Sequence, residues 1–164
     1  MRRSGLLGDE ENAPSWKRLV RILDLPSTTH GISDAKQSGM DLPDLLARTH
    51  RFAIDSIKFY RRLQKTPDAQ VPGVQYLKSS TAVNSNYRAA RRARSPKEFI
   101  SKLGNVVEEA DESVEWLEVM RDASVAKDPA LLSEARQLCA IFTASLTTAR
   151  RNAKKKEDGQ GNET

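Results

Sequence analysis

The chain has 164 residues, the length of one ordinary domain, and its 27 Lys and Arg against 22 Asp and Glu leave a net charge of +5. Its one cysteine, Cys139, excludes an intramolecular disulfide and leaves a cysteine-based zinc site without further thiol ligands. No apolar run approaches the ~18–20 residues of a membrane span, and acids follow the Met1-Arg2-Arg3 start, so we expect a cytoplasmic protein without a membrane partner.

The charge is unevenly distributed along the chain. Residues 66–97 carry six Lys or Arg and one acid, whereas residues 98–122 carry eight Asp or Glu and two Lys or Arg. A basic excess is compatible with a nucleic acid or an acidic protein as partner, and it says nothing about the fold.

The first forty residues are rich in Gly, Ser, Thr, Asn and Asp, which predicts a mostly disordered extension over residues 1–40. Apolar residues at helical spacing are compatible with a short amphipathic helix over residues 16–25: Trp16, Leu19, Val20 and Leu23. A first long helix is predicted from an Asp41 cap to about Leu63, because a proline and an acid suit its first turn and a wide apolar face follows.

A second helix is predicted from about Pro72 to Ala93, after a turn at residues 65–68. Its apolar content is thin, and small residues recur along it at helical spacing: Ser79, Ala82, Asn86, Ala89 or Ala90, and Ala93. Such a strip lets another helix approach closely, so we interpret it as a contact surface.

The segment Ser95-Pro96-Lys97-Glu98 predicts the start of a third helix, because serine suits the cap, proline the first helical position, and the glutamate can reach back. Apolar residues repeat at threes and fours from there to about Met120. Asp128-Pro129 opens a fourth helix in the same manner. Residues 153–164 are expected to form a basic and then polar tail, frayed from Glu157 onward.

Four amphipathic helices of about twenty residues, with short connections and no strand-like alternation, predict an all-α fold. We expect an up-and-down antiparallel four-helix bundle over residues 41–152, preceded by the flexible N-terminal extension. Short connections make consecutive helices antiparallel neighbours.

The sequence contains no pattern typical of a catalytic, metal-binding or cofactor-binding site. A di-iron bundle needs Glu-x-x-His on two helices, and neither His30 nor His50 lies in one. The acids of the third helix alternate with its apolar seam, as a solvated or partner-facing surface does, and a metal-dependent hydrolase would need them to bind a divalent cation. Cys139 lies on the core side of the fourth helix, which favours a small buried hydrophobe. We therefore expect no enzymatic activity and no cofactor.

The strongest functional signal is a cluster of four arginines with no acid among them: Arg88, Arg91, Arg92 and Arg94. Guanidinium groups bind phosphate bidentately, and three of these residues share a helix face. Other cations could widen the surface: Lys78, Arg61, Arg62 and the run from Lys154 to Lys156. Only Tyr87 stands beside the arginines as an aromatic residue, so we expect contact with the sugar–phosphate backbone and little base stacking.

The other interpretation is that these arginines pair with the acids of the third helix, within one subunit or across an interface. Exposed pairs of this kind contribute only ~0–1 kcal/mol each, and they would leave no free positive patch. The sequence leaves both interpretations open, and an oligomer could combine them.

From about residue 44 to residue 152, the chain resembles the bacterial four-helix-bundle proteins named after the intervening sequences of 23S ribosomal RNA. The resemblance rests on segments in the family's order: Asn86-Tyr87-Arg88 with Ala90 and Arg92-Ala93-Arg94-Ser95, Glu98-Phe99-Ile100 with Lys102-Leu103, Glu108-Glu109-Ala110-Asp111-Glu112-Ser113 with Trp116-Leu117-Glu118, and Ile141-Phe142 with Ser145-Leu146 and Ala149-Arg150-Arg151-Asn152. The family often has an acid just after Asn-Tyr-Arg, where this chain has Ala89. This departure either frees Arg88 or Arg92 from a pairing or removes a contact that the family uses.

The resemblance implies an up-and-down bundle that tends to assemble as a five-fold ring, without demonstrated enzymatic activity in most members. A related protein, the accessory variability determinant of diversity-generating retroelements, is a basic pentamer that works with a reverse transcriptase and binds nucleic acid. By this likeness the arginines become candidate nucleic-acid or partner contacts, and Lys78 is assigned with them. Asn86 becomes a structural polar residue near the core or a subunit contact, and Tyr87 and Trp116 are assigned as structural or interface residues.

The resulting hypothesis is a non-enzymatic homo-oligomer, a pentameric ring, that binds RNA, DNA or a nucleoprotein partner such as a reverse transcriptase through its basic surface. The alternative is a protein-binding scaffold in which the arginines and the acids of the third helix form salt bridges between subunits.

Overall fold

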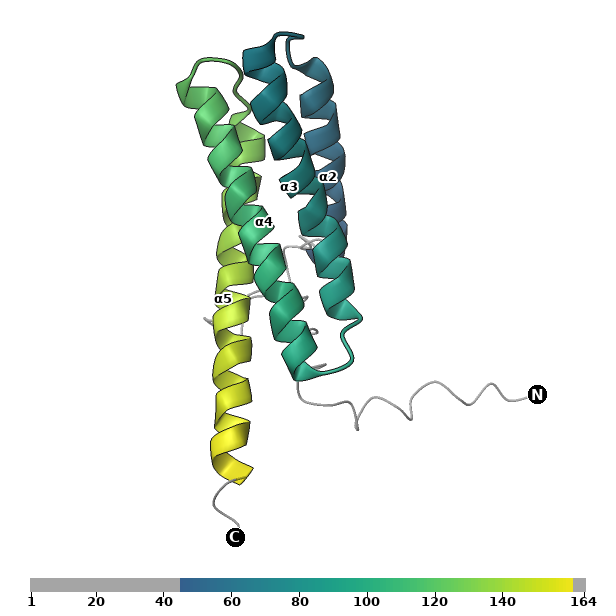
Figure 1. The fold of residues 1–164 in the computed structure, drawn as a ribbon, viewed down its shortest axis with the longest axis vertical. Helices are drawn as coiled ribbons and strands as arrows, with labels where there is room; N and C mark the ends of the chain where they lie inside the picture. Colours follow the sequence, from purple (N-terminus) through teal and green to yellow (C-terminus); the bar gives the residue numbers. More distant parts are fainter. Residues whose placement is uncertain (1–44, 161–164) are drawn as a thin grey trace, which may run out of the picture. The chain divides into compact units, whose positions relative to one another are not determined.

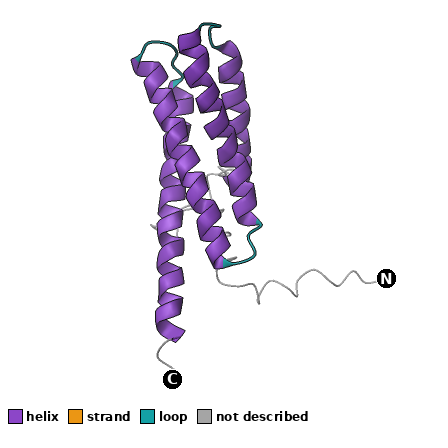
Figure 2. Ribbon diagram, viewed as in Figure 1, coloured by secondary structure: helices purple, strands orange, loops and turns teal. Residues whose placement is uncertain are grey.

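The computed structural model describes residues 45–160, with side chains described to residue 155, and this part of the chain is four α-helices (Figures 1 and 2). They are α2 (Leu45–Arg62), α3 (Pro67–Arg91), α4 (Pro96–Asp122) and α5 (Pro129–Gln160). Consecutive helices are antiparallel neighbours, so the predicted all-α, up-and-down four-helix bundle is confirmed. The predictions for residues 1–40, including the helix over 16–25, and for the Asp41 cap lie outside the described residues.

The core follows from the apolar spacing along each helix. Each helix contributes a seam of residues three and four apart, and these seams meet along the bundle axis. The largest fully buried apolar and aromatic side chains are Tyr76, Tyr87, Phe52, Phe99, Phe142, Leu103, Met120 and Leu138.

Two buried hydroxyl contacts hold α3 against its neighbours. The Ser56 hydroxyl on α2 lies 2.7 Å from the Tyr76 hydroxyl on α3 and donates to the Phe52 carbonyl at 2.8 Å. The Ser113 hydroxyl on α4 lies 3.1 Å from the Ser79 hydroxyl on α3. Burial raises the pKa of Tyr76, so this phenol stays neutral in the core.

The predicted start of the second helix at Pro72 is wrong, because α3 begins at Pro67 and contains Pro72. Thr66 is the extended N-cap residue and Pro67 occupies the first helical turn, where a missing N–H removes no helical hydrogen bond. Packing then stabilises the turn before Pro72. Ala69 is buried, and Gln70 accepts a hydrogen bond from the Tyr60 hydroxyl at 3.0 Å.

The predicted capping box at the start of α4 is confirmed, with one shift in its partner. The Ser95 hydroxyl accepts from the Glu98 backbone N–H at 3.1 Å, and Pro96 is the first helical residue. The Glu98 carboxylate reaches back one residue further than in a standard capping box, to the Arg94 backbone N–H at 2.9 Å.

The connection from α4 to α5 is closed by two capping arrangements. Ser124 has a φ of 57°, and beyond it the Val125 N–H donates to the Met120 carbonyl at 2.9 Å, a hydrogen-bond pattern that commonly ends helices. Asp128 then caps α5, because its carboxylate accepts from the Leu131 N–H at 3.0 Å.

The fourth helix is longer than predicted. It continues to Gln160, through the residues from Glu157 onward that were expected to fray. Arginine, alanine and lysine make up most of residues 150–156, and all three are strong helix formers, so local propensity supports the extension over this stretch. Figure 1 shows α5 running past the ends of α3 and α4.

The strip of small residues on α3 packs partly within the chain. Ser79, Ala90 and Ala93 are buried, and Ala82 and Ala89 are half-buried. The contact between Ser79 and α4 shows that α4 is one helix that uses this strip. Among the described residues, no helix is both long and apolar enough to cross a membrane.

Candidate nucleic-acid interface

The four predicted arginines lie at the C-terminal end of α3 and in the turn that follows it. Arg88 and Arg92 are four residues apart, so they share a helix face, and both are exposed. Neither forms an ion pair or side-chain hydrogen bond within residues 45–155. Arg91 is half-buried.

Arg94 is held by the cap of α4. Its Nε lies 3.1 Å from a Glu98 carboxylate oxygen, while its side chain remains 89% exposed. The hydrogen bonds from the Arg94 backbone and guanidinium keep the pKa of Glu98 below its ordinary value. Arg94 is therefore accessible to a ligand, but a phosphate would have to compete with this carboxylate.

The register between α3 and α4 separates the arginines from the acids. Ser79 lies opposite Ser113 in an antiparallel pair, so Arg88, nine residues later, lies level with about Gly104. The acids of α4 lie further along the bundle: Glu108, Glu109, Asp111, Glu112, Glu115 and Glu118. Within one subunit, the predicted pairing of Arg88 and Arg92 with these acids is therefore absent from the described residues.

The structure brings the cation-rich C-terminal part of α5 to the same end of the bundle as the α3 arginines. The rings of Tyr87 and Phe142 are 5.1 Å apart across the core, and α3 and α5 run in the same direction. Ala93 and Ala149 are the last buried residues of this end. Exposed cations follow on α5: Arg150, Arg151, Lys154 and Lys155.

We call this region the basic end, formed by residues 86–104 and 143–155. The first segment carries six Lys or Arg and the second carries four, and Glu98 is the one acid in both. In the described structure that acid is already bound to Arg94. Within residues 86–104 and 143–155, ten cations therefore accompany a single carboxylate, which is already paired; Glu157 and Asp158 follow further along α5.

Three cations predicted to widen the surface lie elsewhere. Arg61 and Arg62 end α2 at the opposite end of the bundle, because α2 is antiparallel to α3. The Arg62 guanidinium lies 3.2 Å from the Asp128 carboxylate, so it is partly neutralised. Lys78 is exposed in the middle of α3, about 15 Å along the helix from Arg88.

The aromatic residue beside the arginines is unavailable for stacking on bases. Tyr87 is fully buried against Phe142, and the neighbouring Asn86 is half-buried. Trp116 lies on α4, half-buried, and its indole N–H donates to the Glu112 carboxylate at 3.0 Å. Binding at the basic end would therefore rest on charge and guanidinium geometry.

The acid surface of α4 has few partners within the chain. Glu118 pairs with Arg136 of α5, whereas Glu108 and Glu115 form no ion pair within the described residues. Partial burial, helped by two neighbouring glutamates, raises the pKa of Glu109. Among residues 45–155, no three His, Cys, Asp or Glu side chains come together in a way that could hold a metal ion.

Cys139 is half-buried, so it is more exposed than the small buried hydrophobe that the sequence predicted. Its thiol lies 3.9 Å from an Asp111 carboxylate oxygen. Burial and this carboxylate raise the pKa of Cys139, which lowers the fraction of reactive thiolate.

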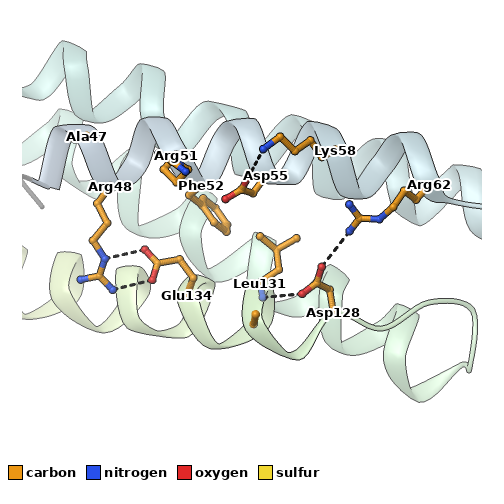
Figure 3. A pocket seen from close by; sticks show the side chains of 11 residues that line it. Ala47, Arg48, Arg51, Phe52, Asp55, Lys58, Arg62, Asp128, Leu131 and Glu134 are labelled. Carbon is orange, nitrogen blue, oxygen red and sulfur yellow. Dashed lines mark hydrogen bonds and ion pairs between the residues drawn. The ribbon is translucent and has the colours of Figure 1, made fainter.

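A groove between α2 and α5 was not predicted from the sequence (Figure 3). Phe52 and Leu131 line it, with a volume of about 620 Å³. Ion pairs cross it near both ends: Arg48 to Glu134 at 2.8 Å, and Arg62 to Asp128 at 3.2 Å. The partners Arg48 and Glu134 are 86 positions apart, so no local sequence pattern could reveal the pair.

The comparisons with known proteins support the fold. The described bundle is similar to a crystal structure from Bacteroides thetaiotaomicron, a protein of unknown function from the S23 ribosomal protein family, with a TM-score of 0.58 and 23% sequence identity. The match covers 63% of this chain and 95% of that one. No protein-family model matches the chain, and no curated protein matches it.

Proposed function

We propose that this protein binds the sugar–phosphate backbone of nucleic acid through the basic end. The observation that carries the proposal is the segregation of charge: ten Lys or Arg lie in the two segments of this end, with one acid. Arg88 and Arg92 are exposed and have no ion-pair partner in residues 45–155. Phosphate contacts by such residues release counterions and give an affinity that falls with salt.

The binding is expected to be insensitive to sequence. The nearby Tyr87 ring is buried, so unpaired bases find no aromatic surface beside the arginines. Guanidinium and ammonium groups grip phosphates without reading bases. We expect this role without catalysis, in a homo-oligomer related to the proteins of the 23S rRNA intervening sequences. The likeness to an S23-family protein is a likeness of fold.

The test is binding to a generic duplex across a salt series. Each of two double variants removes two positive charges: R88Q/R92Q at the basic end and R61Q/K65Q at the opposite end. We expect R88Q/R92Q to lower the slope of log K against log salt by about 2, and R61Q/K65Q to leave it near that of the parent. Equal losses in both variants, or no binding by the parent at low salt, would contradict the proposal.

A second candidate function is a self-assembling scaffold in which the α3 arginines of one subunit contact the α4 acids of another. The observation in its favour is that Glu108 and Glu115, like Arg88 and Arg92, lack ion pairs within the described chain. Light scattering of R88Q/R92Q tests it. Dissociation of an oligomer that the parent forms would favour the scaffold, and an intact oligomer with lost duplex binding would favour the nucleic-acid interface.

A further inference from the structure

We infer that the free end of α5 enters the major groove of B-form DNA. This inference rests on the proposed function and deepens it, because it names the class of nucleic acid and the element that meets it. It starts from the length of α5, which continues to Gln160, well beyond Ala149, the last buried residue among the side chains described to residue 155. At 1.5 Å per residue these eleven residues extend about 16 Å as a helix, and they run past α3 and α4 in Figure 1.

The side chains of this free end are arranged as one cationic face. Arg150 and Lys154 are four residues apart, as are Arg151 and Lys155, so the four charges form two adjacent stripes. All four are exposed. Over residues 150–155, the face that continues the buried seam carries only Ala153, about 130° around the helix from the middle of the cations.

This arrangement excludes two other common ligands of basic helices. A helix that lies on a membrane, or in the groove of an acidic protein, needs large apolar anchors on one side. Between positions 150 and 155 the free end has none, because Ala153 is its one apolar residue. Phosphate is the ligand chemistry that suits the four cations of residues 150–155 without anchors, and the free end keeps a positive net charge when Lys156, Glu157 and Asp158 are counted.

The width of the helix favours B-form DNA over A-form RNA as the duplex that it enters. An α-helix with its side chains is about 10–12 Å across, and the major groove of B-form DNA is about 12 Å wide. The major groove of A-form RNA is too deep and narrow to admit it. A free helical end can enter the DNA groove only where no other element covers it, and among the described helices neither α3 nor α4 extends as far as the end of α5.

The test compares 20-base-pair DNA and RNA duplexes of the same sequence with the full chain and with A153P. Proline at position 153 breaks the free end of the helix without changing any charge. We expect the parent to bind DNA at least tenfold more tightly than RNA at the same salt, and A153P to lose most of this difference while keeping its RNA affinity. The matched control is A144G, at an exposed position earlier in α5, with circular dichroism to show that both variants fold.

Methyl green, which occupies the major groove, should compete with the parent for DNA, and a minor-groove ligand should not. Equal DNA and RNA affinities that A153P leaves unchanged would overturn the groove inference and leave backbone binding by the basic end intact. A preference for RNA would also overturn it. If the parent binds neither duplex at low salt, the proposed function itself fails.

Discussion

The two ends of the bundle both carry cations, but they differ in what faces them. At the end formed by the α2–α3 and α4–α5 connections, which we call the paired end, ion pairs join Arg62 to Asp128, Arg121 to Asp122 and Arg136 to Glu118. At the basic end Arg94 pairs with Glu98, whereas Arg88 and Arg92 form no ion pair within residues 45–155. The net charge of the chain does not reveal this difference. It arises because antiparallel packing places each charged residue at a fixed height along the bundle axis.

Packing also differs between two helical glycines, one toward each end of the bundle. A methyl group added to Gly73, toward the paired end, would overlap Leu63 Cδ1 and lie 3.3 Å from Tyr60 Cδ2. The same addition at Gly104, level with Arg88, meets nothing within 4 Å. Gly73 therefore lies in a tight helix contact, whereas Gly104 is a half-buried position with open space beside it.

The largest expected effect is on stability at these two sites. Gly73→Ala should lower the free energy of unfolding by about 1–3 kcal/mol, because Leu63 and Tyr60 must move in a packed site. Gly104→Ala should raise it by about 0.5–1 kcal/mol, because alanine favours a helix and meets no neighbour. Urea unfolding of both variants gives the two values, and equal signs would contradict the difference in packing between these two positions.

The helix caps give the next contrast. Ser95 accepts a hydrogen bond from the Glu98 N–H, whereas Thr66, the N-cap of α3 at the paired end, makes no side-chain cap bond. Ser95→Ala should therefore cost about 1 kcal/mol, and Thr66→Ala much less. Thermal unfolding can rank the pair, and a larger loss for Thr66→Ala would refute this assignment of the caps.

A smaller gain is expected at the α4–α5 connection. Ser124 has a φ of 57°, a conformation that glycine adopts without the steric cost of a Cβ. Ser124→Gly should stabilise the bundle by about 0.5–1 kcal/mol, less the extra freedom that glycine has in the unfolded chain. Ala123→Gly, one residue earlier with a φ of −77°, is the control and should destabilise.

The smallest effects are in the pH dependence of two glutamates with opposite shifts. The pKa of Glu98 is lowered by Arg94, so its stabilisation is present above the pKa of an unfolded Glu and is lost as the pH falls through the folded pKa. The pKa of Glu109 is raised, chiefly by burial, so this carboxylate opposes folding at neutral pH and stops doing so as the pH falls through its folded pKa.

Unfolding at pH 7 and at acidic pH checks both signs. Glu98→Gln should destabilise at pH 7 and become neutral in acid, whereas Glu109→Gln should stabilise at pH 7 and become neutral in acid. The two variants remove the same charge from the same helix. If both changed the stability at pH 7 in the same direction, the effect would come from net charge alone.

The sequence by itself determined the class of fold and most of its helices. Apolar spacing of three and four is a local property, and the capping box at Ser95 is complete within four residues, so both could be predicted without tertiary contacts. The four arginines could be found in the same way, because they are neighbours in the chain. The start of α3 was misplaced because Pro72 reads locally as a first-turn proline.

The tertiary structure alone decided which charges meet. The register of Ser79 with Ser113 carries Arg88 past the acids of α4, and parallel α3 and α5 bring Arg150 to the same end. Arg62, which the sequence offers as part of the same surface, is placed at the other end beside Asp128. Electrostatic interactions fall off with distance in space, and separation along the sequence does not determine that distance, so the basic end exists only once the helices have packed.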